Sequence, residues 1–393
     1  MTEVVICSAV RTAIGKFQGT LKDTPAVRLG AAAIKEAVAR AKIDPKLIDE
    51  VIMGNVLSGG LGQNPARQAS IYAGVPVEAG ALTVNKVCGS GMKAMMLAAS
   101  EIRAGDADVV IAGGMESMNM APFALDKARF GYRMNNQPII DLMVNDGLWD
   151  VYNNFHMGNT GEIIAEKYSI PRKEIDEFAL QSNLRAAAAI KNGWFKEEIV
   201  PFDVPAGKGQ TVKFEIDEGV RADSSIEKLS KLGPAFRKDG VVTAGNASQI
   251  SDGAAALVMM SAHKAKELGA PVVAKVSHYC FAGTKPELVM YAPVPTIYKY
   301  MKQSGAKISD FDLIEHNEAF ASASVAVAME FKIPHDRFNI HGGAVALGHP
   351  IGCSGARIMV TLIHALKRTG GKKGLGTVCL GGGNGVAMGI ELA

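Results

Sequence analysis

The sequence predicts an α/β fold made of two similar halves, the first of which is interrupted by an inserted segment. Short apolar runs, typical of buried strands, alternate with helical patterns from residue 4 to residue 114, and again from residue 253 onward. Between these parts the alternation stops, and a Met- and Asn-rich stretch precedes one long Ala-rich helix. Strands that are apolar on both faces belong in a sheet covered by helices on both sides.

In the first half, apolar periodicity and turn residues predict four strands and three helices. The strands are expected at residues 4–10, 50–56, 81–87 and 108–114. The helices are expected at residues 25–41, 64–73 and 89–103. Asn64 and Pro65 are typical of a helix start, which supports the second of these helices.

The insert and the second half follow the same rules. Within the insert, Pro171 at a first helical turn predicts a long helix over residues 172–191. In the second half, strands are expected at residues 255–260, 272–280, 311–316, 376–380 and 385–392. The helices are expected at residues 318–331 and 352–368.

Parts of the first half recur in the second. Residues 50–55 resemble residues 312–317, and the Cys-Gly-Ser-Gly turn at 88–91 resembles the Cys-Ser-Gly turn at 353–355. After each turn come a helix, a glycine turn and a strand that ends in two glycines. We therefore expect a duplicated domain. The expected boundaries divide the chain into residues 1–118 with 244–270, an inserted loop domain at 119–243, and residues 271–393.

Composition excludes several classes of function. The 42 Lys and Arg residues against 39 Asp and Glu leave a net charge of only +3, so we expect no general attraction to nucleic acid or to a membrane. The five cysteines are scattered, odd in number and free of Cys-x-x-Cys pairs, which argues against a disulfide framework and a metal site. No export signal or membrane span is evident. We expect a cytoplasmic protein with reduced thiols.

The segment at residues 85–91 combines a strand end, a glycine-containing turn and a helix start around Cys88. This order aims the Cys88 thiol at a helix N-terminus, where backbone N–H groups and the helix dipole lower the pKa of a thiol. Gly89 and Gly91 allow a tight turn and a close approach of substrate. Cys88 is therefore a candidate nucleophile, although an average Cys is more often a buried structural residue.

Two further segments place polar residues at expected strand ends and helix starts. His349 stands between Gly348 and Pro350, and the proline keeps it out of the helix interior, so it is a general base or a surface-loop residue. Asn317 follows an expected strand and precedes an expected helix. It is therefore a site residue or the N-cap of that helix.

A fourth segment, residues 379–385, has four glycines beside a second thiol, that of Cys379. A strand is expected after these glycines, whereas a dinucleotide-binding loop would be followed by a helix. Exposed backbone N–H groups suit an oxyanion hole, which needs donors aimed at developing negative charge. The segment therefore indicates acyl chemistry more than nucleotide binding.

With these four segments in this order, the chain resembles the thiolase family, in its acetyl-CoA acetyltransferase branch, over essentially its full length. The resemblance implies a five-layer αβαβα sandwich whose inserted loop domain binds coenzyme A, and a homotetramer formed from two tight dimers. It implies the reversible Claisen condensation of two acetyl-CoA molecules to acetoacetyl-CoA and coenzyme A, by a ping-pong mechanism. Coenzyme A thioesters are then the substrates, and no tightly bound cofactor is expected.

The resemblance also assigns roles to individual residues. Cys88 takes the first acetyl group as a thioester, and Cys379 serves as the acid/base of the second half-reaction. His349 activates Cys88, while Asn317 holds a water that completes the oxyanion hole for the enolate. The backbone N–H groups of Cys88 and Gly381 form the other oxyanion hole.

Coenzyme A carries phosphates and a long pantetheine arm, so its site needs cations outside and an apolar tunnel inside. By the same resemblance, residues of the insert and of two neighbouring loops contact the substrate. These residues are His156, Met157, Arg221, Ser225, Ala244, Ser248, Ala319 and Phe320. If the resemblance to the family is set aside, the simplest interpretation places Met157 in the packed core and Arg221 on the solvated surface.

Some positions depart from the usual thiolase pattern. His341 and Ser251 stand where thiolases usually have Asn, and Gln249 replaces a usual Gly. Tyr291 makes the wall of the acyl pocket bulkier. If its ring fills the pocket, short acyl chains are favoured; if it points outward, Val289 lines a wider pocket that admits medium chains.

Three alternatives remain open at this point. A broader-chain 3-ketoacyl-CoA thiolase that acts in the degradation of fatty acids would share all four segments. A ketoacyl synthase or hydroxymethylglutaryl-CoA synthase would share the fold and the nucleophile but would lack Cys379. A silent acyl-thioester binding protein would have no need of both thiols together with His349 and Asn317.

Overall fold

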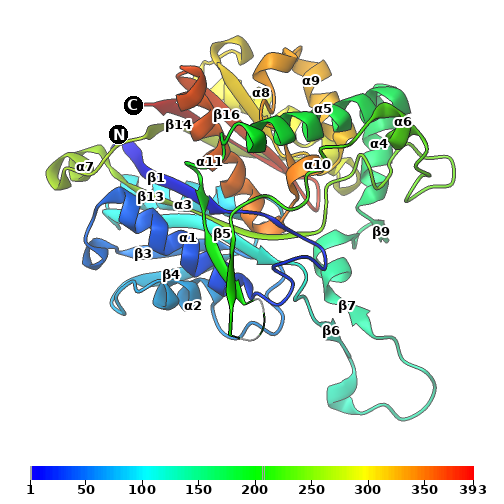
Figure 1. The fold of residues 1–393 in the computed structure, drawn as a ribbon, viewed down its shortest axis with the longest axis horizontal. Coiled ribbons are helices and arrows are strands. Elements are labelled where there is room, and N and C mark those ends of the chain that lie inside the picture. The colour runs from blue at the N-terminus through cyan, green and yellow to red at the C-terminus, as the bar shows by residue number, and fades with distance from the viewer. Residues whose placement is uncertain (1, 206, 208) are drawn as a thin grey trace.

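Five layers of secondary structure form the body of the molecule in the computed structural model, which describes residues 2–205, 207 and 209–393. Two sheets, one from each half of the chain, lie on either side of a central layer of helices, and further helices cover their outer faces (Figure 1). This αβαβα arrangement matches the fold class that the sequence predicts.

The sheet of the first half has five main strands. In spatial order they are β1 (Val4–Thr12), β13 (Ser251–Ser261), β5 (Val109–Ser117), β3 (Glu50–Gly54) and β4 (Gly80–Val84), with β2 (Gly15–Lys16) paired to β13. Every residue of β1, β5 and β13 is buried, as the apolar runs predict. The helices of this half are α1 (Ala26–Ala41), α2 (Pro65–Tyr72), α3 (Ser90–Ala104) and α7 (Ala262–Leu268). Helices α1 and α2 pack on the outer face, and α3 packs on the inner face.

The sheet of the second half repeats this plan. In spatial order its strands are β14 (Ala274–Gly283), β17 (Asn384–Leu392), β16 (Lys373–Leu380) and β15 (Leu313–His316). Its helices are α8 (Pro293–Ser304), α9 (Ala321–Phe331), α10 (Ala344–Leu347) and α11 (Ile351–Thr369). Helix α11 packs against α3 in the central layer, and α8 covers the outer face.

The strand order confirms the predicted duplication. The order β1, β13, β5, β3 in the first half corresponds to β14, β17, β16, β15 in the second. In both halves the central helix, α3 or α11, immediately precedes the third of these strands, β5 or β16. The two sheets meet where β1 pairs with β14 at Val5–Lys275 and Ile6–Ala274. The exact domain boundaries remain a prediction.

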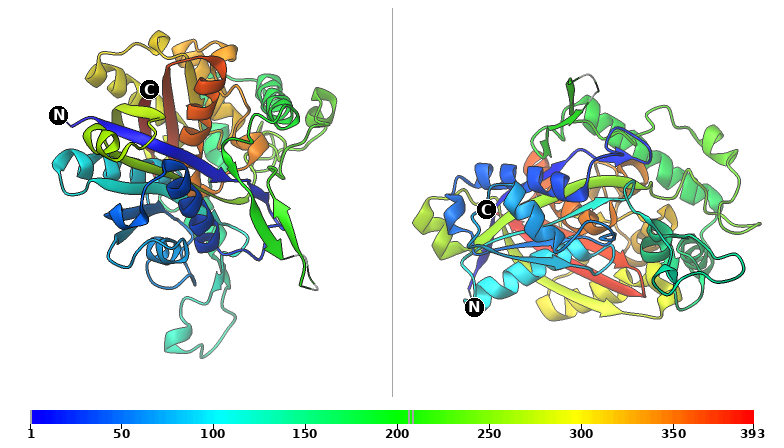
Figure 2. Two further views of the ribbon diagram at one scale, coloured as in Figure 1. Left: turned by 60° about the vertical axis from the view of Figure 1, so that its left-hand side comes forward. Right: turned by 90° about the horizontal axis from the view of Figure 1, so that it is seen from below.

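The chain leaves the first sheet after β5, contacts it briefly where β10 pairs with β1, and returns to its centre with β13. The elements between them are β6 (Phe123–Ala124), β7 (Ile140–Asp141), β8 (Trp149–Asp150), β9 (Phe155–His156), α4 (Gly158–Tyr168), α5 (Arg172–Lys191), β10 (Ile199–Val200), β11 (Phe202–Pro205), β12 (Thr211–Phe214) and α6 (Ile226–Ser230). The segment between β6 and β7 projects away from the body of the molecule (Figures 1 and 2). Across the described residues, no helix combines the length and the apolar character that crossing a membrane requires.

Local differences from the predicted elements concern the ends of strands and helices, and a set of helices that were not predicted. The strand expected at 81–87 ends at Val84, because the chain turns at Val87, whose φ is +46°. The helix expected from residue 318 begins at Ala321, and its N-cap is Phe320. Asn317 is therefore not the N-cap of this helix. Among the described residues, five helices were not predicted from the sequence, namely α4, α6, α7, α8 and α10.

Candidate active site

The turn that carries Cys88 lies between β4 and α3 and is packed against the second half of the chain. A Cβ atom added at Gly89 would lie 2.1 Å from the Leu380 side chain, and one added at Gly91 would lie 2.7 Å from the backbone nitrogen of Ala356. These contacts require glycine at both positions. The tight turn therefore brings Cys88 against the end of β16 and the first turns of α11.

The two predicted thiols come together at this point. The backbone N–H groups of Gly381 and of Cys88 itself donate hydrogen bonds to the Cys88 thiol, and both interactions lower its pKa. Burial has the larger effect and raises the pKa of Cys88 to about 12, so the lowered pKa predicted from the helix start is wrong. Burial also raises the pKa of Cys379, and the neighbouring Cys88 raises it further. Both resting thiols are therefore protonated, and Cys88 needs a base.

His349 has the geometry of such a base. Its Nδ1 lies 2.6 Å from the hydroxyl of Ser354, which donates its own proton to the Pro350 carbonyl at 2.9 Å. The hydroxyl must therefore accept from Nδ1–H, which leaves Nε2 unprotonated. Burial, followed by the charge of Arg357, lowers the pKa of His349 to about 3. The imidazole is neutral near neutral pH, with its free nitrogen available as a proton acceptor.

Asn317 lies beside this nitrogen. The Asn317 side-chain nitrogen is 3.4 Å from Nε2 of His349, and both residues are buried. The side-chain oxygen of Asn317 is also buried and has no hydrogen-bond partner among the described residues. A buried carbonyl oxygen without a donor is unfavourable, so this atom favours a water or substrate donor in the site.

The segment that carries His349 is held by the residues that depart from the usual thiolase pattern. The backbone N–H of His349 donates to the Gln249 carbonyl at 3.1 Å and to the Ser251 hydroxyl at 3.2 Å. The Gln249 side chain donates to the carbonyls of Gly219 and Val345. These contacts join the insert to the His349 segment, which a glycine at 249 would not do.

A cavity of about 580 Å³ opens beside His349. Six predicted site residues line it, namely His156, Arg221, Ala244, Ser248, Phe320 and His349. Met157 and Ala319 pack with Cys379 in the apolar cluster that also contains Phe320. Ser225 instead begins α6, where its hydroxyl accepts a hydrogen bond from the Lys228 backbone N–H.

The cavity wall also contains residues that sequence reasoning missed, including Lys16, Phe17, Leu148, Phe236 and Ile351. The ring of His156 stacks on Phe236 with centroids 4.8 Å apart. Its Nδ1 accepts from the Gly158 backbone N–H at 3.0 Å, so the proton is on Nε2. No sequence signal pointed to Phe236, because it meets His156 only in the folded chain.

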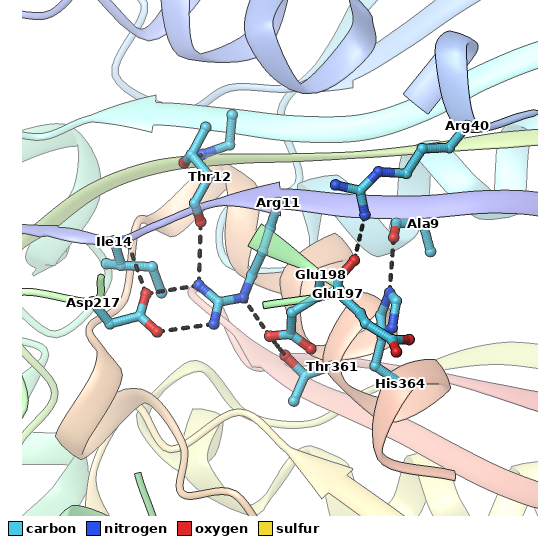
Figure 3. Close-up of polar contacts among 11 residues, drawn as sticks. Ala9, Arg11, Thr12, Ile14, Arg40, Glu197, Glu198, Asp217, Thr361 and His364 are labelled. Atoms are coloured by element: carbon cyan, nitrogen blue, oxygen red, sulfur yellow. Dashed lines mark hydrogen bonds and ion pairs between the residues drawn. The ribbon is translucent and has the colours of Figure 1, made fainter. Parts of the chain in front are cut away.

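The insert is anchored to the first half by a buried ion cluster around Arg11 of β1 (Figure 3). The Arg11 guanidinium contacts Asp217 through two nitrogens at 2.7 and 2.9 Å, and donates through Nε to Glu198 at 2.6 Å. Glu198 also accepts from the Thr361 hydroxyl of α11. Arg221, which lines the cavity, is four residues beyond Asp217, so the cluster fixes the insert near the cavity.

His341, another departure from the thiolase pattern, lies away from the cavity. Arg368 donates to its Nε2 at 2.9 and 2.6 Å, and its ring packs against Trp194 and Phe195. The residue joins α11 to the segment after α5. Among the described residues, no group of three or more His, Cys, Asp or Glu side chains is placed to hold a metal ion.

Comparison with known proteins agrees with this arrangement. Residues 4–263 match the model of the thiolase N-terminal domain, and residues 270–392 match that of the thiolase C-terminal domain. The chain is 52% identical over 388 residues to an acetyl-CoA acetyltransferase of Pseudomonas aeruginosa, covering 99% of each chain. It is also 52% identical over 391 residues to one of Cupriavidus necator, covering 100% of each.

Other relatives extend the comparison. The chain is 49% identical over 387 residues to a probable acetyl-CoA acyltransferase of Staphylococcus epidermidis, covering 98% of each chain. The crystal structure of the Bacillus anthracis acetyl-CoA acetyltransferase superposes with a TM-score of 0.98 at 44% identity, over 100% of this chain and 99% of that one. With both family models matched across two joined halves, the chain belongs to the thiolase family.

Proposed function

We propose that this thiolase is an acetyl-CoA C-acetyltransferase, which condenses two acetyl-CoA molecules to acetoacetyl-CoA and coenzyme A through an acetyl-Cys88 intermediate. The observation that carries this proposal is the meeting of Cys88 and Cys379, from the two halves, beside Gly381. The names of the full-length relatives from Pseudomonas aeruginosa and Cupriavidus necator support the same activity.

In the first half-reaction, Nε2 of His349 takes the proton of Cys88, and the thiolate attacks the carbonyl carbon of acetyl-CoA. The backbone N–H groups of Cys88 and Gly381, already directed at the thiol, stabilise the oxyanion that forms. The bond from the carbonyl carbon to the sulfur of coenzyme A then breaks. The leaving thiolate takes the proton of Cys379, so the half-reaction ends with acetyl-Cys88, a Cys379 thiolate and protonated His349.

In the second half-reaction, the Cys379 thiolate removes a proton from the α-carbon of a second acetyl-CoA. Protonated His349 and a water held by Asn317 stabilise the enolate oxygen. This role is consistent with the side-chain oxygen of Asn317, which has no partner among the residues that the structure describes. The enolate carbon attacks acetyl-Cys88, and the carbon–sulfur bond to Cys88 breaks. His349 returns its proton to Cys88, which restores both thiols and the neutral imidazole.

We assign the cavity of about 580 Å³ to the pantetheine arm and the nucleotide of coenzyme A. Arg221 is exposed at this cavity and suits the phosphate-bearing end, whereas Phe320 belongs to the apolar part nearer Cys379. Met157 and Ala319 complete that apolar part in this proposal, with Ala244 and Ser248 on the wall. For Ser225 we propose a contact outside the cavity.

We also propose a cytoplasmic homotetramer built from two dimers. β4 is an edge strand that pairs only with β3 in the described structure, and the arm between β6 and β7 exposes Phe130 and Met134. Edge strands and exposed apolar side chains of this kind are typical of surfaces between subunits. Free thiols at the site suit a reducing compartment, and all five cysteines are free.

The activity is tested by the absorbance of the magnesium enolate of acetoacetyl-CoA. It should fall when free coenzyme A is added and stay constant without it. Brief exposure to acetyl-CoA, followed by peptide mass mapping, should place an acetyl group on Cys88. A protein that binds coenzyme A thioesters but changes neither the absorbance nor its own mass would contradict the proposal.

A further inference from the structure

Glu116, at the end of β5, is a fully buried carboxylate outside the residues assigned to the site above. It accepts four hydrogen bonds. Oε1 receives the side-chain nitrogen of Asn55 at 2.8 Å and the backbone N–H of Leu57 at 3.1 Å. Oε2 receives the backbone N–H groups of Val56 at 3.0 Å and of Gly352 at 2.8 Å.

This donor set indicates an ionised carboxylate. Each carboxylate oxygen accepts two hydrogen bonds, and in the part of the chain that the structure describes, every neighbouring group at hydrogen-bond distance is a donor. If Glu116 were protonated, its O–H group would find no acceptor there. No Lys, Arg or His side chain of the described residues forms a salt bridge with Glu116, so hydrogen bonds alone offset the burial of its charge. Burial of an unpaired charge costs free energy of desolvation, so we expect these hydrogen bonds to perform a role.

The four donors come from the surroundings of the two residues that exchange a proton in the proposed mechanism. Asn55, Val56 and Leu57 follow β3 in the first half, and Val56 and Leu57 pack with Cys88 in one apolar cluster. Gly352 belongs to the second half, in the first turn of α11, three residues after His349. Glu116 therefore joins the wall around Cys88 to the start of the helix that follows His349.

The backbone around this junction has no room for displacement. A Cβ atom added at Gly114 would lie 2.1 Å from the carbonyl oxygen of Gly352, and one added at Gly54 would lie 2.6 Å from the same oxygen. A Cβ atom on Gly352 would lie 2.8 Å from the Cα of Asn55. The first turn of α11 thus sits directly on β5 and on the end of β3, held by Glu116.

We propose that Glu116 is a positioning residue for acyl transfer, whose carboxylate holds the start of α11, and with it His349, in register with Cys88. The inference rests on the proposed roles of Cys88 and His349. Glu116 does not touch substrate in this proposal. It acts through the placement of one segment relative to the other, across the boundary between the halves.

The charge of Glu116 has a second, separable effect. Burial is the largest cause of the raised pKa of Cys88 and of Cys353, and the charge of Glu116 raises both further. Burial, and after it the neighbouring carboxylate of Asp252, raises the pKa of Glu116 itself. Loss of the charge should therefore make the Cys88 thiol more acidic. This effect acts through space, so it follows the charge of Glu116 and not the placement of α11.

The test is Glu116→Gln, which keeps the size of the side chain. The amide has two orientations, and in each of them its NH₂ group faces two N–H donors and loses their hydrogen bonds. Acetylation of Cys88 by acetyl-CoA, followed by rapid quenching and mass spectrometry, should slow by about 100-fold, the order of loss for a misplaced reacting group. KM should change little, because Glu116 does not line the cavity. Alkylation of Cys88 by iodoacetamide at one fixed pH should become faster.

Slower acetylation in a variant that keeps the wild-type midpoint of urea denaturation separates this role from a structural one. Asp150→Asn is the matched control, because Asp150 is a buried carboxylate that accepts from Tyr152 and Asn153 within the insert. It should leave the alkylation rate as in the wild type. If Glu116→Gln does not fold, Asn55→Ala removes one of the four donors and should slow acetylation about tenfold.

Wild-type acetylation in folded Glu116→Gln, or alkylation and acetylation that slow together, would overturn the proposal. So would a folded Asn55→Ala with an unchanged acetylation rate. A wild-type protein acetylated on a residue other than Cys88 would instead overturn the proposed function, which distinguishes the two failures.

Discussion

The thioether sulfur of Met290 lies 3.7 Å from the thiol sulfur of Cys379, whereas the next side chain, Tyr291, points to α4. The Tyr291 ring lies 6.4 Å from that of Tyr168, and the ammonium of Lys167 lies 4.8 Å from its centre. The large side chain beside the Cys379 thiol is therefore Met290 and not Tyr291. This changes which residue we expect to limit the length of the acyl chain.

We predict that acetoacetyl-CoA is cleaved faster than 3-ketoacyl-CoAs of six or more carbons, because Met290 occupies the space a longer chain would need. Met290→Ala should raise kcat/KM for the six-carbon substrate relative to the four-carbon one by about tenfold, since one methylene is worth about 1–3 kcal/mol in an apolar pocket. Tyr291→Phe is the control and should leave the ratio unchanged. A wild-type kcat/KM that rises from four to ten carbons would favour the broader-chain thiolase instead.

The two thiols should act at different stages. Cys88→Ala should abolish labelling by acetyl-CoA, whereas Cys379→Ser should accept the acetyl group but condense it about 10²- to 10⁴-fold more slowly, the usual loss for a general acid/base. Single-turnover labelling and steady-state condensation measure the two steps. Cys7, Cys280 and Cys353 are buried and should remain unlabelled. Full labelling of the Cys88→Ala variant would reverse the assignment.

The pH dependence should be set by Glu116 and not by His349. The pKa of His349 is lowered to about 3, so this imidazole stays neutral through the usual assay range. Burial raises the pKa of Glu116 to about 7 against the effect of its backbone donors. As the pH falls through about 7, Glu116 gains a proton and loses hydrogen bonds, so the rate of Cys88 acetylation should fall.

In Glu116→Gln the rate should already be low and should lack this acidic decline, as measured by acetylation rates across the pH range. Stability should move in the other direction. Folded Glu116 binds a proton more tightly than the unfolded side chain, so its contribution to the free energy of unfolding decreases as pH rises from about 4.5 to about 7. An acidic decline that persists in the variant would assign it to another group.

The ion cluster of Arg11 should matter for both stability and substrate affinity. Arg11→Leu leaves Asp217 and Glu198 buried without their cation, which should lower the free energy of unfolding by about 3–5 kcal/mol, as measured by urea denaturation. KM for acetyl-CoA should rise because the segment with Arg221 loses its anchor. Lys231→Met removes the exposed pair with Glu227 and should change stability by less than about 1 kcal/mol.

The arm between β6 and β7 should hold subunits together. Phe130 and Met134 are 84% and 80% exposed in the chain alone, a large exposure for apolar side chains. Replacing both by Ser should reduce the mass measured by light scattering from that of a tetramer to that of a dimer, with Cys88 acetylation retained. A wild-type protein that is active only as a monomer would contradict the proposed assembly.

The sequence predicts those features of the site whose residues are neighbours in the chain, and it misses those that distant segments form together. The Cys88 turn and the Cys379 loop could be predicted, because their glycines and thiols are adjacent in the chain and dictate a local geometry. The pKa of Cys88 was predicted in the wrong direction, because burial of a thiol is decided by distant elements. Glu116 and Phe236 escaped prediction for the same reason.

The duplication likewise followed from recurring short patterns, while the strand ends did not. The helix expected at Glu318 begins at Ala321 because the chain first pairs Phe320 with Ala247 of another segment. Ser354 could have been found, since it lies one helical turn beyond Pro350 and five residues after His349. The hydrogen bond between the Ser354 hydroxyl and Nδ1 of His349 became evident only from the structure.

The position of β13 affects how the chain can fold as it is made. This strand lies between β1 and β5 in the first sheet, yet it follows the whole insert in the sequence. At a synthesis rate of about 5–20 residues per second, the emerging chain holds β1 and β5 for several seconds without the strand that joins them. Until Ser261 has left the ribosome, β5 can pair on one side only, with β3, and β1 lacks its main neighbour. A nascent chain stopped in the insert therefore exposes the open edges of both strands to aggregation.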